Sequence, residues 1–528
     1  MTPSAPRYRD LLHDGLARAA ARRPDKIALH VGNESMSFGE LDAQSDRLAA
    51  ALQARGLARG DRVAIFMDNT LPCAVSIFGV LKAGGVFLVI NPQTKHDKLC
   101  FIANDCAVRH LVTDIHLANV AGAVVGAVPS LTHILVSGRG DSLDALSGPG
   151  ITTEWLDDVL AAPTPATQPR GTIPTDLASL IYTSGSTGNP KGVMQTHQSM
   201  AFAVGSLVEY QRIDEDDVLI NMLPMAFDYG LYQLLMSVAT GATLVLERSF
   251  TYPAEVFARM QQHGVTHFPG VPTIYTMMIA AHRRKPLEFP GVRRVTNTAA
   301  ALHPTLFPTL REIFPNALIF AMYGLTECKR VSYLPPELVD AKPGSVGVAI
   351  PGTEVYLRSP EGEPVAPGEP GILHVRGPHV MRGYWNNPER TAKMLRPGDI
   401  PGEMVLCTGD WFRMDEDGCL YFLSRSDDII KTRGEKVSPA EVEAALCAVP
   451  GVYEAAVIGV PDEVLGQAIR AFVVPQAGAE LEERRLRREL MGRLENFMVP
   501  RDIILRESLP KSPNGKIDRK TLAQEGAS

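Results

Sequence analysis

The feature that most restricts the fold of this chain is the alternation of short β-rich runs with longer helical stretches near its start. A β-rich run at 62–67 precedes a helical stretch at 71–82, which is followed by another β-rich run at 86–90. Strands joined through a covering helix pair in parallel, because such a crossover needs about a dozen residues. The spacing therefore predicts an α/β fold with parallel sheets and helices on their faces.

The chain is too long for one ordinary core, and its pattern changes twice. With 528 residues, two or three folding units are expected. After about residue 350, short β runs separated by glycines predict a small β-barrel-like subdomain, and near residue 427 a compact α+β pattern begins. We therefore expect a large N-terminal domain over 1–426, with its β-rich part at about 350–426, and a small C-terminal domain over 427–528.

Charge and composition argue against several classes of protein. The net charge of −7, without a long block of like charge, disfavours a nucleic-acid-binding role. The longest apolar stretch, Ala74–Ile90, contains Lys82 and two adjacent glycines, so it is too short and too interrupted to insert into a membrane. The seven cysteines are scattered without a Cys-x-x-Cys pair, which predicts no structural zinc and a reduced, cytoplasmic setting.

The segment 182–192 is rich in groups that suit a phosphate. It reads Tyr-Thr-Ser-Gly-Ser-Thr-Gly-Asn-Pro-Lys-Gly and lies between two runs that predict strands. Its glycines allow backbone N–H groups to converge on one point, while its hydroxyls and Lys191 can contact phosphate oxygens. The segment is not a Walker loop, which needs Gly-Lys-Ser/Thr at the start of a helix. A flexible surface hairpin is the ordinary alternative.

Four further clusters carry weaker signals. Tyr323-Gly-Leu-Thr-Glu327 follows a predicted strand, where α/β sheets bind ligands, and Glu327 suits Mg²⁺, although a surface turn fits equally well. Thr408-Gly-Asp410 could accept the hydroxyls of a ribose or form an Asx turn. The charged run 424–439 and Lys516 have ordinary interpretations as a solvated linker and an exposed tail lysine.

Taken together, in their order and spacing, these five clusters resemble the adenylate-forming superfamily of acyl-CoA synthetases, nonribosomal adenylation domains and luciferases. The resemblance extends from about residue 29 to Lys516 and includes Glu495-Asn-Phe-Met-Val-Pro500. It implies an enzyme that uses ATP and Mg²⁺ to convert a carboxylic acid into an acyl-adenylate with release of pyrophosphate. The acyl group then passes to a thiol, and a mobile C-terminal domain accompanies the two steps.

The resemblance also implies a role for each matching residue. Lys516, Thr183 and Glu327 would be catalytic, and Glu327 would hold the metal. Asp427 would be the hinge of the C-terminal domain. The implied ATP-binding residues are Thr183, Ser184, Gly185, Ser186, Thr187, Gly188, Lys191, Ala300, Tyr323, Gly324, Thr326, Asp410, Arg425 and Lys516.

The identity of the acid depends on Asp228. In amino-acid-activating relatives an aspartate at this place pairs with the substrate ammonium, and a buried carboxylate without a partner is costly. We therefore favour an amino acid, such as a β-amino acid used in natural-product biosynthesis. The alternative is that Lys329 or Arg330 neutralises Asp228 and that a fatty or other carboxylic acid is joined to CoA. The expected substrate-binding residues are Asp228, Tyr229, Tyr232, Thr298, Ala299, Met322, Lys329 and Arg330.

The thiol acceptor is expected to act in trans, because only twelve residues follow Lys516. It would be an acyl or peptidyl carrier protein, or CoA. Two other functions stay open at this point. A non-enzymatic sensor of acyl groups or nucleotides is disfavoured, since Glu327, Asp410 and Lys516 are all intact. A luciferase-like oxidation is not distinguished by the motifs.

Overall fold

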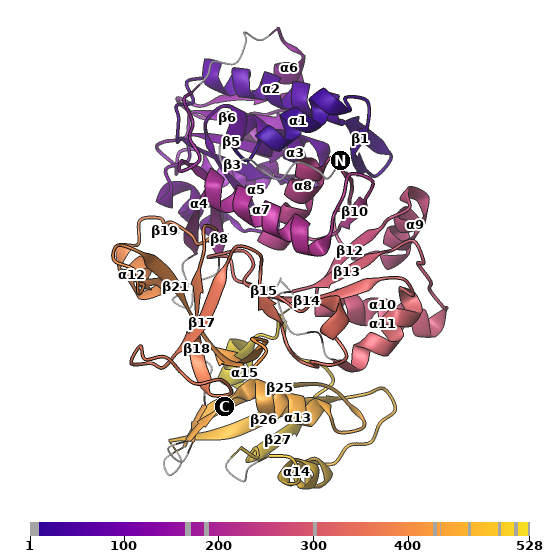
Figure 1. The fold of residues 1–528 in the computed structure, drawn as a ribbon. Coiled ribbons are helices and arrows are strands. Elements are labelled where there is room, and N and C mark those ends of the chain that lie inside the picture. The colour runs from indigo at the N-terminus through magenta and orange to yellow at the C-terminus, as the bar shows by residue number, and fades with distance from the viewer. Residues whose placement is uncertain are drawn as a thin grey trace.

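Four β-sheets organise the part of the chain that the structure describes (Figure 1). The computed structural model describes residues 10–163, 170–183, 190–298, 302, 304–425, 430–432, 435–462, 466–494, 498–511 and 516–525. In Figure 1 the two large sheets and their helices fill the upper part, and the C-terminal sheet lies at the bottom. The predicted α/β class, with a large N-terminal part and a small C-terminal part, is confirmed.

The first large sheet contains the parallel strands that the alternating pattern predicted. Its order is β19-β9-β8-β4-β3-β5-β6-β7. Its strands are β3 (Arg62–Phe66), β4 (Val86–Ile90), β5 (His110–Asp114), β6 (His133–Ser137), β7 (Thr152–Trp155), β8 (Leu177–Thr183), β9 (Lys191–Thr196) and β19 (Gly383–Tyr384). Strands β3 to β7 pair in parallel, whereas β8, β9 and β19 are joined by antiparallel pairing. The edge beside β9 is therefore completed by a strand from a distant part of the sequence.

The second large sheet has nine strands in the order β16-β15-β14-β13-β12-β10-β11-β1-β2. Its strands are β1 (Ile27–Val31), β2 (Glu34–Ser37), β10 (Val218–Asn221), β11 (Thr243–Leu246), β12 (His267–Gly270), β13 (Arg294–Asn297), β14 (Leu318–Tyr323), β15 (Ser332–Tyr333) and β16 (Val348–Ala349). The run from β14 to β1 is parallel, and antiparallel strands form both edges.

Helices pack between and around the two large sheets. The helices of this part are α1 (Asp14–Arg22), α2 (Phe38–Ala54), α3 (Leu71–Lys82), α4 (His96–Asp105), α5 (Ala118–Ala121), α6 (Leu156–Ala161), α7 (His197–Gln211), α8 (Asp228–Thr240), α9 (Pro253–His263), α10 (Pro272–Arg284) and α11 (Phe307–Ile313). Helix α2 begins after Ser37, whose side chain and that of Glu40 form a capping box. Side chains of α2, α3, α7 and α8 share one apolar core with strands of both sheets, so the sheets form a single unit.

The β-rich part and the C-terminal part each have their own sheet. The first contains β17 (Glu354–Arg358), β18 (Pro370–Arg376), β20 (Leu395–Pro397), β21 (Met404–Met414) and β22 (Leu420–Arg425), together with α12 (Pro388–Met394). The second contains β23 (Ile430–Thr432), β24 (Glu435–Val437), β25 (Val452–Asp462), β26 (Gly466–Pro475) and β27 (Asp502–Leu505), together with α13 (Pro439–Cys447), α14 (Glu483–Met491) and α15 (Arg519–Glu525). The expected hinge, Asp427, lies outside the described residues.

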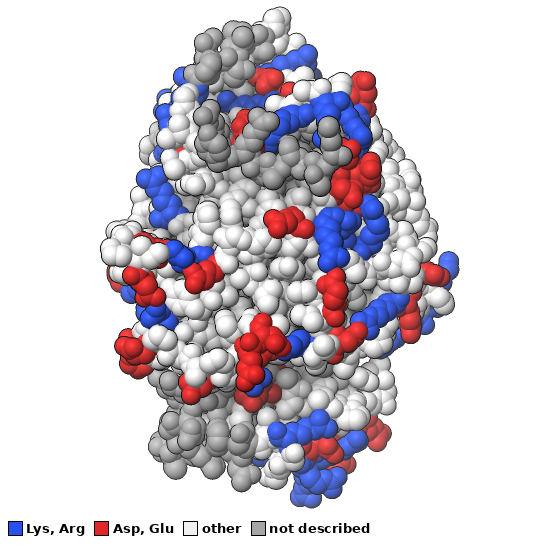
Figure 2. All heavy atoms as spheres, viewed as in Figure 1, with Lys and Arg blue, Asp and Glu red and all other residues white. Residues whose placement is uncertain are grey.

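Charged side chains of both signs are mixed over the face shown in Figure 2. The charged cluster at the bottom of that view lies over α14, which buries Leu486 and Leu490 and pairs Arg487 with Glu483 on its exposed side. In the part of the chain that the structure describes, we find no helix with the length and apolar character needed to cross a bilayer.

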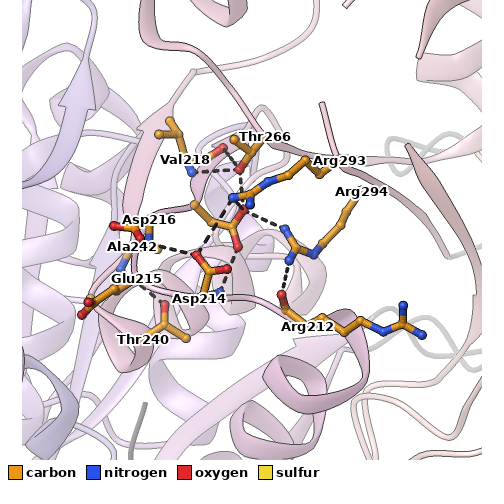
Figure 3. A network of polar contacts seen from close by, with 12 residues as sticks. Arg212, Asp214, Glu215, Asp216, Val218, Thr240, Ala242, Thr266, Arg293 and Arg294 are labelled. Carbon is orange, nitrogen blue, oxygen red and sulfur yellow. Dashed lines mark hydrogen bonds and ion pairs between the residues drawn. The ribbon is translucent and has the colours of Figure 1, made fainter. Parts of the chain in front are cut away.

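A buried charge network links three neighbouring strands of the nine-stranded sheet (Figure 3). The Asp217 carboxylate, just before β10, is fully buried and accepts hydrogen bonds from Thr266 at 2.6 Å, Arg293 at 2.6 Å and Arg294 at 2.7 Å. Although burial acts to raise it, these bonds hold the pKa of Asp217 below its usual value. Arg294 also donates to the carbonyl of Arg212 at the end of α7. The network therefore ties that helix end to the sheet.

We expect Asp217→Asn to lower the free energy of unfolding by about 3–5 kcal/mol, because it leaves two arginines beside a neutral group in a buried site. Urea unfolding measures the change. The control is Asp340→Asn, which removes an exposed pair with Arg311 at 2.8 Å and should cost less than about 1 kcal/mol. Equal losses in the two variants would contradict a special role for the buried network.

Candidate active site

Expected site residues from four separate segments meet around Lys516. This lysine is partly buried and interacts electrostatically with Arg425 and with the carboxylates of Asp228, Asp410 and Glu327. Burial and the nearby Arg425 lower the pKa of Lys516, while the three carboxylates act in the opposite direction. The fold thus brings the C-terminal lysine to acidic groups that lie far away along the chain.

Tyr323 and Asp410 link the nine-stranded sheet to the β-rich part. Tyr323 Oη donates to Asp410 Oδ2 at 2.5 Å, and Arg425 Nε lies 3.8 Å from Oδ1 of the same carboxylate. The Tyr323 ring packs edge-on against Phe412, with ring centres 4.8 Å apart. Burial raises the pKa of Asp410, whereas Arg425 and Tyr323 act to lower it. The carboxylate is therefore held in one orientation and can accept hydrogen bonds from neighbouring hydroxyls.

Tyr384 is a candidate site residue that sequence analysis did not identify. Its hydroxyl donates a hydrogen bond to Glu327 Oε1, and Lys191 Nζ lies 5.3 Å from the centre of its ring. The pairing of β19 with β9 places Tyr384 opposite Val193. The residue reaches the site only through this pairing, so no local pattern in the sequence distinguished it from other aromatic residues of the β-rich part.

The glycine-rich segment joins β8 to β9. Thr183 and Lys191 are paired across this hairpin, so they flank the residues between them. Gly192 packs closely against Tyr182, since a Cβ there would lie 3.0 Å from the Tyr182 ring. Several expected site residues lie outside the described part of the chain and have no structural account here: Ser184, Gly185, Ser186, Thr187, Gly188, Ala299 and Ala300.

The turn after β14 is tightly folded and fixes the side chains that follow it. The backbone N–H groups of Cys328 and Lys329 donate to the carbonyl of Leu325 at 3.0 and 2.7 Å. Gly324 packs against this turn so closely that a Cβ would overlap the carbonyl oxygen of Lys329. Lys329 itself has a φ of 67°, a left-handed conformation that residues with a side chain rarely adopt. The carbonyl of Thr326 accepts a hydrogen bond from Gln195 at 3.3 Å.

A buried group of charges lies beside this turn. Asp228 begins α8, where the positive end of the helix dipole stabilises a carboxylate, and it is 9% exposed. Lys329 and Arg330 are each 4% exposed. Burial lowers the pKa of Lys329 to about 8, against the opposing attraction of Asp228 and Glu327. The expected substrate-binding charges therefore come together away from water.

Aromatic and polar side chains surround these charges. The guanidinium of Arg330 donates to Thr298 Oγ1 and lies 5.3 Å from the centre of the Tyr229 ring. Lys329 Nζ lies 5.9 Å from the centre of the Tyr232 ring. Met322 is also buried, and its sulfur accepts a hydrogen bond from the Tyr210 hydroxyl. Tyr210 in turn interacts electrostatically with Arg330. The described members of the expected substrate-binding set are thus neighbours in space.

Two family models match the chain. Residues 16–385 match the model described as AMP-binding enzyme, and residues 441–516 match that of the AMP-binding enzyme C-terminal domain. Among curated proteins, the long-chain-fatty-acid–CoA ligase of Bacillus subtilis (strain 168) is 32% identical to this chain. That alignment covers 97% of this chain and 93% of the relative.

Solved structures of similar proteins cover almost the same length. The anthranilate CoA ligase AuaEII, in complex with anthranoyl-AMP, superposes with a TM-score of 0.88 at 27% identity and covers 100% of both chains. The o-succinylbenzoate CoA synthetase MenE of Bacillus subtilis, in complex with ATP and a magnesium ion, superposes with a TM-score of 0.80 at 26% identity. It covers 96% of this chain and 98% of its own.

The tight turn after β14 gives a direct test. We expect Gly324→Ala to lower the free energy of unfolding by about 1–3 kcal/mol, because the added methyl group overlaps the backbone of Lys329. Gly291→Ala is the matched control, since the nearest atom to its Cβ, the carbonyl oxygen of Val265, is 3.9 Å away. Thermal unfolding compares the two. A Gly324→Ala protein as stable as the control would show that the turn is not constrained.

Proposed function

The chain belongs to the family of AMP-binding enzymes and is an AMP-forming acid–thiol ligase that uses ATP with Mg²⁺, and on that premise we propose that it joins a carboxylic acid to CoA through an acyl-adenylate. The observation that carries the proposal is the convergence of Lys516 with Asp410, Arg425 and Glu327. It gathers groups for a ribose, a metal-bound phosphate and a reacting carboxylate in one place.

In the first step, an oxygen of the carboxylate attacks the α-phosphorus of ATP. The new O–P bond forms as the bond from that phosphorus to the bridging oxygen breaks, and pyrophosphate leaves with the electron pair. Two anions must approach each other, so positive charge is needed between them. Lys516 supplies it as a mobile point charge on a long stem. Thr183 and Lys191, with residues 184–188 between them, hold the departing phosphates.

Asp410 accepts hydrogen bonds from the ribose hydroxyls, in the orientation that Tyr323 and Arg425 impose on it. Ala300, Gly324 and Thr326 complete the nucleotide site. Glu327 fits a magnesium ligand, because its hard carboxylate oxygens are held in place by Tyr384. When bound, Mg²⁺ neutralises phosphate charge.

In the second step, the sulfur of the thiol attacks the acyl carbon. A C–S bond forms, the bond between that carbon and the AMP oxygen breaks, and the thiol proton passes to solvent. We propose that the C-terminal domain, residues 427–528, turns about Asp427 relative to the N-terminal domain, residues 1–426, between the two steps. The rotation withdraws Lys516 from a site that no longer needs it and admits the thiol.

The surroundings of Asp228 support a carboxylic acid without an amine. Loading of an amino acid or β-amino acid onto a carrier protein would need this carboxylate to bind the substrate ammonium. The buried Lys329 already interacts electrostatically with it, and the buried Arg330 acts, as Asp228 does, on the neighbouring Tyr232. A substrate cation would join a group that has an excess of positive charge. The charge balance therefore favours the acid–CoA ligase over the amino-acid-loading enzyme.

Lys516→Ala separates the two steps. We expect adenylation, measured as pyrophosphate release, to fall at least about 100-fold, because charge neutralisation at the reacting groups is lost. Transfer from preformed acyl-AMP to CoA should persist, because the lysine is not needed there. Lys511→Ala is the control, since Lys511 belongs to the same domain and pairs with Glu454 at 3.0 Å. Equal loss of both half-reactions would contradict the division of roles.

The class of acid is tested with a panel of amino acids and amine-free acids. We expect the wild-type protein to release pyrophosphate with amine-free acids and to form acyl-CoA, detected by mass spectrometry. Asp228→Asn should keep this activity within about tenfold, because no substrate cation depends on that charge. Activation of an amino acid that falls about 100-fold in Asp228→Asn would instead support amino-acid loading.

A further inference from the structure

Three buried polar groups in and around Tyr232 have no hydrogen-bond partner among the described residues. They are Lys329 Nζ, Arg330 Nε and Tyr232 Oη. Lys329 and Arg330 are each 4% exposed, and Tyr232 is 2% exposed. A buried ammonium without an acceptor loses its hydration and gains nothing in exchange. These groups therefore point to an acceptor that the described residues do not provide.

The position of Lys329 is imposed by the backbone. The left-handed φ of Lys329 and the close approach of Gly324 fix the direction in which the side chain leaves the turn. Backbone strain of this kind persists where the surrounding structure holds it, and it is concentrated at functional sites. A lysine needed only for packing could be replaced by an apolar side chain at no cost in charge burial. A binding role accounts for both the strain and the buried charge.

The charges around Tyr232 do not cancel. Asp228 supplies one negative charge, whereas Lys329 and Arg330 supply two positive charges. Glu327 also attracts Lys329, but a magnesium ion held by Glu327, as proposed above, would compensate that second negative charge. No ion pair within 4.0 Å joins Lys329 or Arg330 to a carboxylate in the described part of the chain. One further negative charge would neutralise the group and give the free donors an acceptor.

Resting on the proposed function, we propose that the acid activated by this enzyme carries a second anionic group, in the simplest case a second carboxylate. Lys329 and Arg330 bind this group, with Tyr232 Oη as an additional donor, while Lys516 contacts the carboxylate that reacts. Asp228 and Glu327 act electrostatically on both Lys329 and Lys516. The two binding points thus share the same two carboxylates as electrostatic neighbours, and short dicarboxylic acids are the first candidates to test.

The test compares acids that differ only at the far end. Butyrate is paired with succinate, pentanoate with glutarate and hexanoate with adipate, and pyrophosphate release is measured for each. In the wild type we expect kcat/KM to be at least about 30-fold higher for the preferred diacid than for its methyl-ended partner, as charged hydrogen bonds allow. Lys329→Met, which keeps the length of the side chain, should remove this preference by lowering diacid activation alone.

Two further variants separate binding from folding. Lys329→Arg keeps the positive charge and should restore at least part of the preference for the diacid. Lys393→Met changes an exposed lysine of α12 and should leave the preference intact. Loss of activity with both kinds of acid in Lys329→Met, together with no rescue in Lys329→Arg, would show a structural role and overturn the inference.

The outcome in the wild type also separates this inference from the proposed function. If the wild type prefers the methyl-ended acids, the proposal of a second anionic group in the substrate is wrong, and the proposed ligase activity is still supported. If neither series is activated, the result counts against the proposed function. The proposal of a second anionic group is then tested by acid binding alone. Diacids alone should raise the Tm of the wild-type protein more than their methyl-ended partners do. A Tm shift of equal size for both series would contradict the proposal that the substrate carries a second anionic group.

Discussion

The arrangement of the active site depends on the balance of charge around Lys516. Asp228, Asp410 and Glu327 come from different elements, and their mutual repulsion would oppose close approach without cations among them. Lys516 and Arg425 provide part of this compensation, and Lys329 provides more on the side of Asp228. The same balance governs the chemistry, because a carboxylate and a polyphosphate can meet only where their charges are neutralised.

Rigid elements on either side of these charges hold them at short range. The Tyr323–Asp410 hydrogen bond joins two sheets, and Tyr384 reaches Glu327 because β19 pairs with β9. The turn that follows β14 is held by its own backbone hydrogen bonds and by the absence of a side chain at Gly324. The C-terminal lysine, by contrast, lies in the part of the chain whose sheet has apolar cores of its own.

Asp228 is one member of a group of buried charged and aromatic side chains. Taken as an isolated acidic residue, Asp228 suggests a substrate amine. In the folded chain, Lys329 interacts electrostatically with it, and the buried Lys329 and Arg330 each keep a donor without an acceptor, which supports the proposal of a substrate with an additional negative group. In the proposals made above, the reaction and the selection of the acid are separate: Lys516 and the nucleotide-binding groups serve the first, and Lys329 and Arg330 serve the second.

The sequence alone determined the α/β class and the adenylate-forming family, because these follow from local periodicity and from short motifs. The roles of Tyr323, Asp410 and Lys516 stay predictions. The sequence could not reveal Tyr384, which reaches the site through a strand pairing nearly two hundred residues along the chain. Nor could it show that Lys329 is buried without an acceptor, since burial depends on how α8 and the turn after β14 pack together. Tertiary structure decided which charges are close enough to compensate one another, and electrostatic interaction depends on that distance and not on separation in sequence.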